Sequence, residues 1–242
     1  MESRTEIAYS AVLLALHQSN HLFRPHLAIT DFEPAEMNAW RAVFNCEVQG
    51  CFWHYCRAIT LTARSMQLLG PNYDRVTSII RSCCALPLLE QNMIEEGLLS
   101  LVLEAIAEGL FEYLADYFIY IYDTWIRSHR FQSLSVFLAP FRTNNASESA
   151  NRMLRIRTRV HRPNVATFMD AVRSMESNAY WDILSLTEQE INPSRTRRAS
   201  AVNNDYYILA YTGDLIANRI TINRFLHLAS TRMFNVFHAF LN

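Results

Sequence analysis

Two groups of side chains have the types and spacing to do chemistry. The larger group is a set of arginines that follows residue 151: Arg152, Arg155, Arg157, Arg159 and Arg162. The spacing of Arg152, Arg155 and Arg159 would place them on one face of a helix. Such a row can neutralise phosphates, which predicts DNA binding that is independent of sequence and falls steeply with salt. An ordinary solvated arginine face is the alternative.

The second group is the pair Cys51 and His54, two potential Zn²⁺ ligands at short spacing. A closed structural zinc site needs four ligands, and the remaining Cys and His residues are scattered along the chain. We therefore expect no zinc site and assign the pair an auxiliary, mainly structural role.

The charges of the chain are segregated although they nearly cancel. The formal net charge is -1, and all 22 basic residues are Arg. Residues 88–126 hold eight acids and no Arg, whereas residues 142–162 hold six Arg and one acid. The guanidinium group favours planar, bidentate contacts with phosphate or carboxylate. DNA is therefore a candidate partner despite the balanced total charge.

Cysteine usage and the apolar stretches bear on localisation. Five Cys is an odd number, and the N-terminus lacks the pattern of a secretory signal. The longest apolar stretch, residues 97–122, is interrupted by four acids, which argues against a membrane span. We expect a protein of the nucleus or cytoplasm that is neither secreted nor in a membrane.

The elements that must position these residues are expected to be mostly helices. The chain has only 5 Gly and 7 Pro, and its apolar residues recur at helical spacing. The N-terminal part predicts a helix at 5–19, a strand at 26–30 that ends on Asp31, a helix at 34–44 and a strand at 48–54. This order is half of an α/β unit.

Residues 55–135 predict helices only, at 55–69, 72–86 and 89–129. Acids at four-residue intervals in the last of these should stack on one solvated face of the helix: Glu104, Glu108, Glu112 and Asp116.

The C-terminal part predicts a helix that begins near Ala146, with Asn145 and Glu148 spaced as in a capping box. Glu148 could also pair with Arg152 one turn later. A further helix is expected over about 165–176, with a continuation toward Leu186 as the alternative, followed by a polar linker and a helical tail.

Two segments carry a resemblance to a known family. The string ITDFEPAEMNAWRAVFNCEVQGCFWHY, with Asp31, Cys51 and His54, and the string RTNNASESANRML, with Glu148, stand on either side of a helical block. Their order and spacing resemble the catalytic domain of Mutator-like element (MULE) transposases. The resemblance extends over roughly residues 5–230 and corresponds to the C-terminal part of that domain.

The resemblance implies a predominantly helical α/β fold: a truncated RNase H-like fold with few short strands, its first strands missing, and a large all-α insertion. The expected divisions are a partial core, the insertion, helices completing the core, a linker and a helical tail: 1–54, 55–137, 138–192, 193–205 and 206–242.

The family's chemistry uses three carboxylates that hold two Mg²⁺ ions. The resemblance assigns two of these ancestral metal ligands, Asp31 and Glu148, each of which could instead cap a helix. Only Glu2 and Glu6 precede Asp31 as acids, and neither lies in a strand-like context. Whether the chain acts as an enzyme stays open, and the missing first Asp favours no independent catalysis.

We therefore expect a transposase-derived protein, a catalytically incomplete fragment that retains DNA-binding capacity and could form homo-oligomers. One alternative is a domesticated helical scaffold that binds proteins and has no DNA role. Another is an active recombinase whose first Asp strand is supplied from upstream.

Overall fold

The computed structural model describes residues 4–70, 74–128, 130–160, 162–188 and 199–233. These residues are predominantly helical, with two short parallel strands, which confirms a mostly helical α/β class. Among these residues, none of the helices combines the length and the hydropathy of a membrane span. The contacts divide the chain into two compact units, Met1–Thr143 with Asn203–Asn242, and Asn144–Val202.

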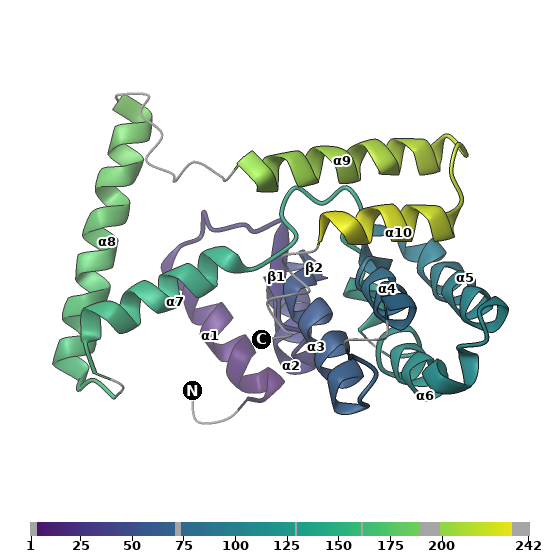
Figure 1. The fold of residues 1–242 in the computed structure, drawn as a ribbon. Coiled ribbons are helices and arrows are strands. Elements are labelled where there is room, and N and C mark those ends of the chain that lie inside the picture. The colour runs from purple at the N-terminus through teal and green to yellow at the C-terminus, as the bar shows by residue number, and fades with distance from the viewer. Residues whose placement is uncertain (1–3, 71–73, 129, 161, 189–198, 234–242) are drawn as a thin grey trace. The chain divides into compact units, whose positions relative to one another are not determined.

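The first unit begins with an α/β segment. Helix α1 (Glu6–Ser19) packs against α2 (Pro34–Phe44), which connects the parallel strands β1 (Leu27–Thr30) and β2 (Glu47–Gly50) (Figure 1). Thr5 caps α1, since its hydroxyl accepts from the Ala8 amide at 3.3 Å. Pro34 occupies the first turn of α2, where its missing N–H costs nothing. The predictions for these two helices are confirmed.

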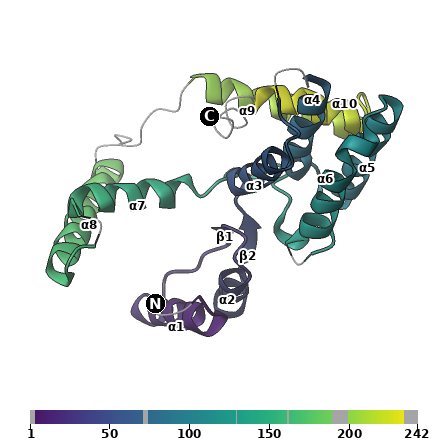
Figure 2. The ribbon, with the colours of Figure 1, turned by 60° about the horizontal axis from the view of Figure 1, so that its bottom comes forward.

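The strands pair in a register that aligns their C-terminal ends. Leu27 lies opposite Glu47 and Thr30 opposite Gly50. A small apolar cluster of Ala28, Met37, Cys46 and Val48 joins the strands to α2. Figure 2 shows the two strands side by side, with α2 next to them.

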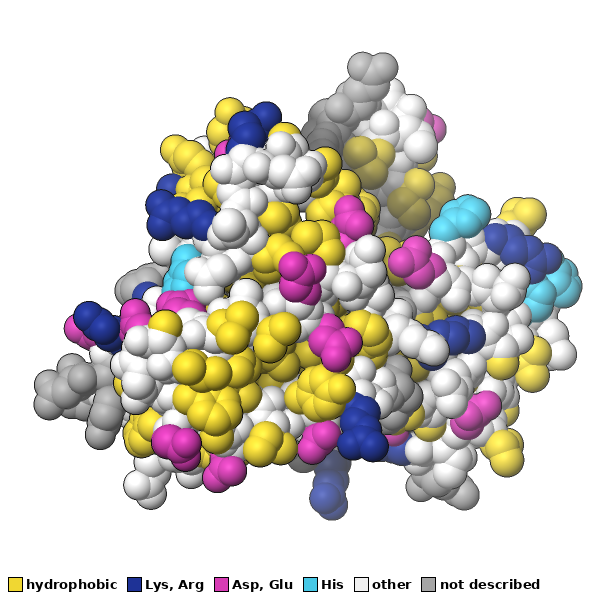
Figure 3. Space-filling view, turned by 90° about the vertical axis from the view of Figure 1, so that its right-hand side faces the viewer, with side chains coloured by type: hydrophobic (Ala, Val, Ile, Leu, Met, Phe, Trp, Pro, Cys, Tyr) yellow, Lys and Arg dark blue, Asp and Glu magenta, His cyan; other side chains and the backbone are white. Residues whose placement is uncertain are grey.

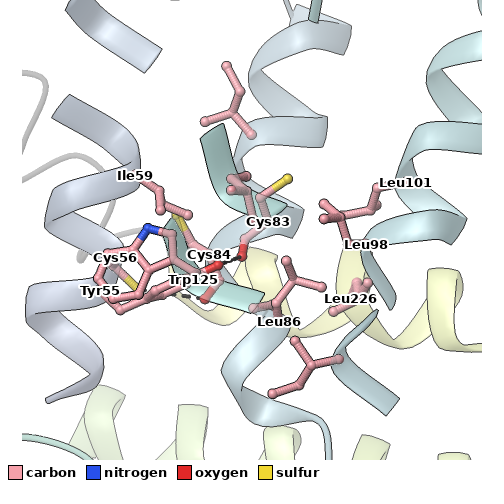
Figure 4. Packing of buried hydrophobic residues seen from close by; sticks show 14 of the residues in the cluster. Tyr55, Cys56, Ile59, Cys83, Cys84, Leu86, Leu98, Leu101, Trp125 and Leu226 are labelled. Carbon is pink, nitrogen blue, oxygen red and sulfur yellow. Dashed lines mark hydrogen bonds between the residues drawn. The ribbon is translucent and has the colours of Figure 1, made fainter. Parts of the chain in front are cut away.

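The further α-helices of the first unit are α3 (Phe52–Ser65), α4 (Asp74–Cys84), α5 (Ile94–Ala107), α6 (Phe111–Ile121), α9 (Ala199–Ile216), whose residues 199–202 are assigned to the second unit, and α10 (Ile222–Arg232). The large apolar core lies among these helices (Figure 4). Inside it the Tyr55 hydroxyl donates to the Cys83 carbonyl at 3.0 Å, and the Cys56 thiol contacts the Cys84 carbonyl at 3.6 Å. Burial raises the pKa of the Cys56 and Cys83 thiols well above 9.0, so both thiols stay protonated and unreactive.

The expected single helix over 89–129 is wrong, because the chain turns between α5 and α6. Gly109 has a left-handed φ of 70°. The Leu110 amide donates to the Ala105 carbonyl at 2.7 Å, and the Gly109 amide to the Ile106 carbonyl at 3.1 Å. These two bonds form a Schellman cap. The four acids therefore lie on two helices and do not form one row.

Helix α6 runs into a π-helical turn at Tyr122–Ile126. This turn carries Trp125, whose ring lies edge-on to Tyr55 at 4.8 Å and to Phe32 at 5.0 Å between centroids. A π-turn adds one residue to the helical repeat. Here the π-turn carries the Trp125 ring, which lies between the helical core and the loop after β1.

The second unit contains α7 (Asn145–Thr158) and α8 (Val165–Glu188). Among the described residues of these two helices, Thr158 and Ala171 are the buried ones. Residues 199–205, expected as the end of a linker, form the first turns of α9. Residues 193–198 of that linker lie outside the described residues.

Candidate metal-binding site

Three side chains with metal-binding atoms gather where the strands end. One ligand atom each from Asp31, Cys51 and His54 lies within 4.8 Å of the others. The Nδ1 atom of His54 is 3.0 Å from the Oδ1 atom of Asp31. The Asp31 side chain is 51% exposed, that of His54 24%, and Cys51 is fully buried. The group therefore opens to solvent on the Asp31 side.

Parallel pairing brings Asp31 and Cys51 together although 20 positions separate them. Each follows the last residue of its strand, and the Cys51 amide donates to the Thr30 carbonyl at 2.7 Å. Side chains that follow neighbouring parallel strands meet at one edge of the sheet. Sequence reasoning placed Asp31 correctly at the end of its strand.

His54 reaches the group because α3 begins earlier than expected. The predicted strand at 48–54 is wrong in its second half: β2 stops at Gly50, Cys51 is the N-cap residue of α3 and His54 lies in the first turn. The Phe52 amide donates to the Arg142 carbonyl at 2.9 Å. That bond satisfies an amide that has no partner within its own helix.

Phe32 and Gly50 fix the backbone around the group. Phe32 has a left-handed φ of 63°, a conformation that is costly for a bulky residue. Its ring lies over Gly50, where an added Cβ would come within 2.0 Å of ring atoms Cε1 and Cζ. Glycine is therefore required at position 50 as long as Phe32 keeps its place against Trp125.

Arg142 connects the site to a distant part of the chain. Its carbonyl caps α3, and its guanidinium pairs with the carboxylate of Asp205 on α9. One residue earlier, the Phe141 carbonyl accepts from the side-chain amide of Gln49 at 2.9 Å. The segment 141–142 thus braces both β2 and the first turn of α3.

Further acids stand near Asp31 at the start of α2. Burial raises the pKa of the Glu36 carboxyl above 4.5; a hydrogen bond with Trp40 opposes this shift, and the charges of Asp31 and Glu33 add to it. Glu33 is the N-cap residue of α2 and makes no side-chain capping bond. The alternative that Asp31 caps α2 is therefore wrong, because Glu33 and not Asp31 is the N-cap residue of this helix.

Glu148 lies in the first helical turns of the other unit. The N-cap of α7 is Asn144, one residue earlier than the capping box with Asn145 requires, and the Glu148 amide donates to the Asn144 carbonyl at 3.2 Å. Glu148 is thus the fourth helical residue, and the expected spacing of the box is off by one.

The arginine set lies on and just after α7. Four of its members are exposed and Arg157 is half-buried. Arg159 does not continue the helical row, because α7 ends at Thr158 and Arg159 is its C-cap with a left-handed φ of 56°. The prediction of one face shared by Arg152, Arg155 and Arg159 is therefore wrong for Arg159.

The donor atoms of the Asp31 group decide which ions suit it. Mg²⁺ prefers carboxylate and water oxygens, whereas sulfur and imidazole nitrogen suit Zn²⁺ and related transition metals. Of the three donors only the Asp31 carboxylate is an oxygen ligand. The Mg²⁺ implied by the sequence resemblance does not fit this set, and no reaction step follows from it.

No protein-family model matches the chain, and no curated protein or solved structure is significantly similar to it.

Four residues that matter at this site were not singled out from the sequence: Phe32, Gly50, Trp125 and Arg142. For Phe32 the only signal in the sequence was its position next to Asp31, and for Gly50 it was the scarcity of glycine in the chain. Trp125 contacts Phe32 and Arg142 contacts Phe52, and each of these contacts joins residues about 90 positions apart in the chain.

Proposed function

We propose that the chain is a transposase-derived protein of the MULE type that binds DNA without cutting it on its own. Its exposed arginines carry this proposal. Arg152, Arg155, Arg159 and Arg162 are all exposed within or just after α7. The Asp31, Cys51 and His54 group, at the ends of two parallel strands ahead of a helical block, supports the descent from an RNase H-like catalytic domain.

Two features support binding without cleavage. A two-metal nuclease needs carboxylates that converge on both ions, and this chain's own residues offer Asp31 and Glu148 for that task. The partners of Asp31 are a thiol and an imidazole, which are poor Mg²⁺ ligands. The arginines need no such site, because phosphate neutralisation depends only on exposed positive charge.

Fluorescence anisotropy with a duplex DNA, repeated at several salt concentrations, tests the proposal. If each of the four exposed arginines meets one phosphate, log affinity should fall against log salt with a slope of roughly -3.6. The double variant Arg152→Ala/Arg155→Ala should bring the slope to roughly -1.8. Arg173→Ala is the matched control, because this guanidinium lies on α8 and pairs with Asp170 at 3.5 Å.

An absence of affinity at low salt, or an equal loss in the Arg173→Ala control, contradicts the role of these arginines. Supercoiled plasmid incubated with the chain and Mg²⁺ should remain uncut. Nicking that disappears in Asp31→Asn would instead establish an active nuclease.

A second candidate function, a scaffold for protein partners, is favoured by one surface of the first unit. Apolar side chains gather on the face of α5 and α6 with acids around them (Figure 3). Leu99, Leu103 and Ile106 form an exposed stripe on α5. A groove of about 420 Å³ beside it is lined by Leu99 and Ile119, more than half exposed, and by Glu95 and Asp123.

This surface fits an amphipathic helix that carries arginines or lysines beside its apolar stripe. A labelled model peptide with leucines at helical spacing and flanking arginines should bind, and Leu99→Ser/Ile119→Ser should weaken it at least tenfold. Leu14→Ser, at an exposed leucine of α1, is the control. Equal binding of a peptide whose arginines are replaced by glutamates excludes the acidic rim as the recognition element.

A further inference from the structure

We propose that Asp31, Cys51 and His54 form a mononuclear site for a thiophilic divalent metal of the Zn²⁺ class, with three protein ligands and an open position. Carboxylate, thiol and imidazole are the donor types found in zinc sites, and three protein ligands are typical of sites that keep a water. The inference rests on this geometry alone and holds whatever the ancestry of the chain.

The spacing of the donor atoms is close to what one ion requires. Zn²⁺ lies about 2.0–2.3 Å from its ligands, so two donors at a tetrahedral ion are roughly 3.2–3.7 Å apart. The observed 3.0 Å between His54 Nδ1 and Asp31 Oδ1, and the upper bound of 4.8 Å for the group, bracket this range.

The backbone holds the ligands in position from two directions. The bond from the Cys51 amide to the Thr30 carbonyl holds Asp31 and Cys51 close together, and His54 lies in the first turn of a helix whose first amide is capped by the Arg142 carbonyl. Cys51 is itself the N-cap residue of α3. The positive end of a helix favours an anion, which is the form in which a cysteine binds metal.

Access and charge also agree with a cation site. Cys51 and His54 lie on the inner side, whereas the Asp31 carboxylate is half-exposed and offers an entry route. Glu33 and Glu36 contribute further negative charge near Asp31. A divalent cation at this position would therefore be favoured electrostatically as well as by its direct ligands.

Co²⁺ titration of the full chain tests the site, because Co²⁺ replaces Zn²⁺ and reports its ligands spectroscopically. We expect one equivalent to produce a near-ultraviolet thiolate-to-cobalt charge-transfer band, with visible bands typical of four coordination. Zn²⁺ should abolish these bands by displacement and should raise the melting temperature, since it binds the folded state. Mg²⁺ at the same concentration should do neither.

Variants assign the ligands. Cys51→Ser should remove the charge-transfer band, and Asp31→Asn should weaken Co²⁺ binding by at least about tenfold. Cys46→Ser is the matched control, because Cys46 is also a buried free thiol beside β2. Circular dichroism would show whether Cys51→Ser folds. If it does not, Asp31→Asn still tests the site, because a substitution of the half-exposed Asp31 should not disturb folding.

The neighbouring rings of His17 and His21, 5.8 Å apart between centroids, are the competing site for an adventitious ion. The proposal is overturned if no charge-transfer band forms, if the band survives in Cys51→Ser, or if His21→Ala removes metal binding while Cys51→Ser and Asp31→Asn leave it unchanged.

Discussion

At the scale of single residues, the contact between Phe32 and Gly50 sets the shape of the site. A methyl group at position 50 would meet the Phe32 ring at 2.0 Å, and the Trp125 ring packs edge-on with the same ring. Neither partner can move without disturbing the loop that carries Asp31.

We predict that Gly50→Ala lowers the free energy of unfolding by about 1–3 kcal/mol, as overpacking of a core does. Urea denaturation followed by circular dichroism measures the change. Gly213→Ala is the control: an added Cβ there meets nothing within 4 Å, and alanine favours the helix. A loss of stability in Gly213→Ala as large as that in Gly50→Ala would remove the steric explanation.

Glu36 gives a residue-scale prediction about pH. Its pKa is raised above 4.5 in the folded chain, mainly by burial. The folded state therefore holds the proton more tightly than the unfolded state, and this group's contribution to stability falls as pH rises through 4.5 towards the folded pKa. Glu36→Gln keeps an uncharged, polar side chain and should raise the melting temperature at pH 7.

The advantage of Glu36→Gln should disappear below pH 4, where the glutamate is protonated in both states. Thermal unfolding at pH 7 and at pH 3.5 measures both parts. A variant less stable than the parent at pH 7 would show that the charge of Glu36 has a favourable partner.

At the scale of elements, a polar network joins α4, α5 and α10. The His227 ring contacts the Glu104 carboxylate at 2.8 Å and the Ser82 hydroxyl at 3.1 Å, and the Asn223 amide donates to the same carboxylate at 2.7 Å. Glu104 is therefore a bridge between helices, although its spacing with the other acids had suggested a solvated position.

We predict that Glu104→Ala destabilises the fold by about 1–3 kcal/mol, because His227 and Asn223 lose their shared acceptor in a partly buried setting. Glu96→Ala, an exposed acid on the same helix, should change stability by less than about 0.5 kcal/mol. Chemical denaturation of both variants measures the difference. Equal losses of stability would contradict the bridging role of Glu104 and indicate that it is an ordinary solvated acid.

Elements with a local signal were predictable from the sequence. The bounds of α1 and α2 follow from apolar periodicity and from Pro34, and the end of β1 at Thr30 follows from its short apolar run. Residues 52–54 were expected to be the end of the strand at 48–54. The start of α3 depends instead on the Arg142 carbonyl, about 90 positions away, which no local pattern reveals.

The candidate site was predictable in its parts but not as a whole. Cys51 and His54 stand out by their spacing, and Asp31 by its place after an apolar run. Their assembly required the strand register and the left-handed Phe32, both of which are tertiary properties. In the sequence, Cys51 and His54 offered only two of the ligands that a zinc site needs. In the structure, Asp31 lies beside them as a third potential donor.

At the scale of the whole molecule, the two units differ in how much they bury. Helices α3 to α6 contribute most of the large core, whereas among the described residues of α7 and α8 only Thr158 and Ala171 are buried. Local stability follows buried apolar contact.

Hydrogen exchange followed by mass spectrometry should therefore show faster amide exchange in residues 145–188 than in α4. The difference should exceed about tenfold, since the opening of a poorly buried unit needs less free energy than global unfolding. Addition of duplex DNA should slow exchange in α7 if its arginines bind phosphate. Equal protection of both units without DNA would contradict their separate stability.

The contact between Arg142 and Asp205 has a consequence for the architecture of the chain. These residues are 63 positions apart, and the second unit lies between them in sequence. The ion pair between Arg142 and Asp205 thus joins the point where the chain leaves the first unit to the point where it returns. Segments whose ends are held together in this way can be shortened, lengthened or exchanged with little effect on the fold that carries them. In this sense α7 and α8 form a replaceable insertion. The candidate metal-ligand group of Asp31, Cys51 and His54 belongs to the unit that carries the insertion.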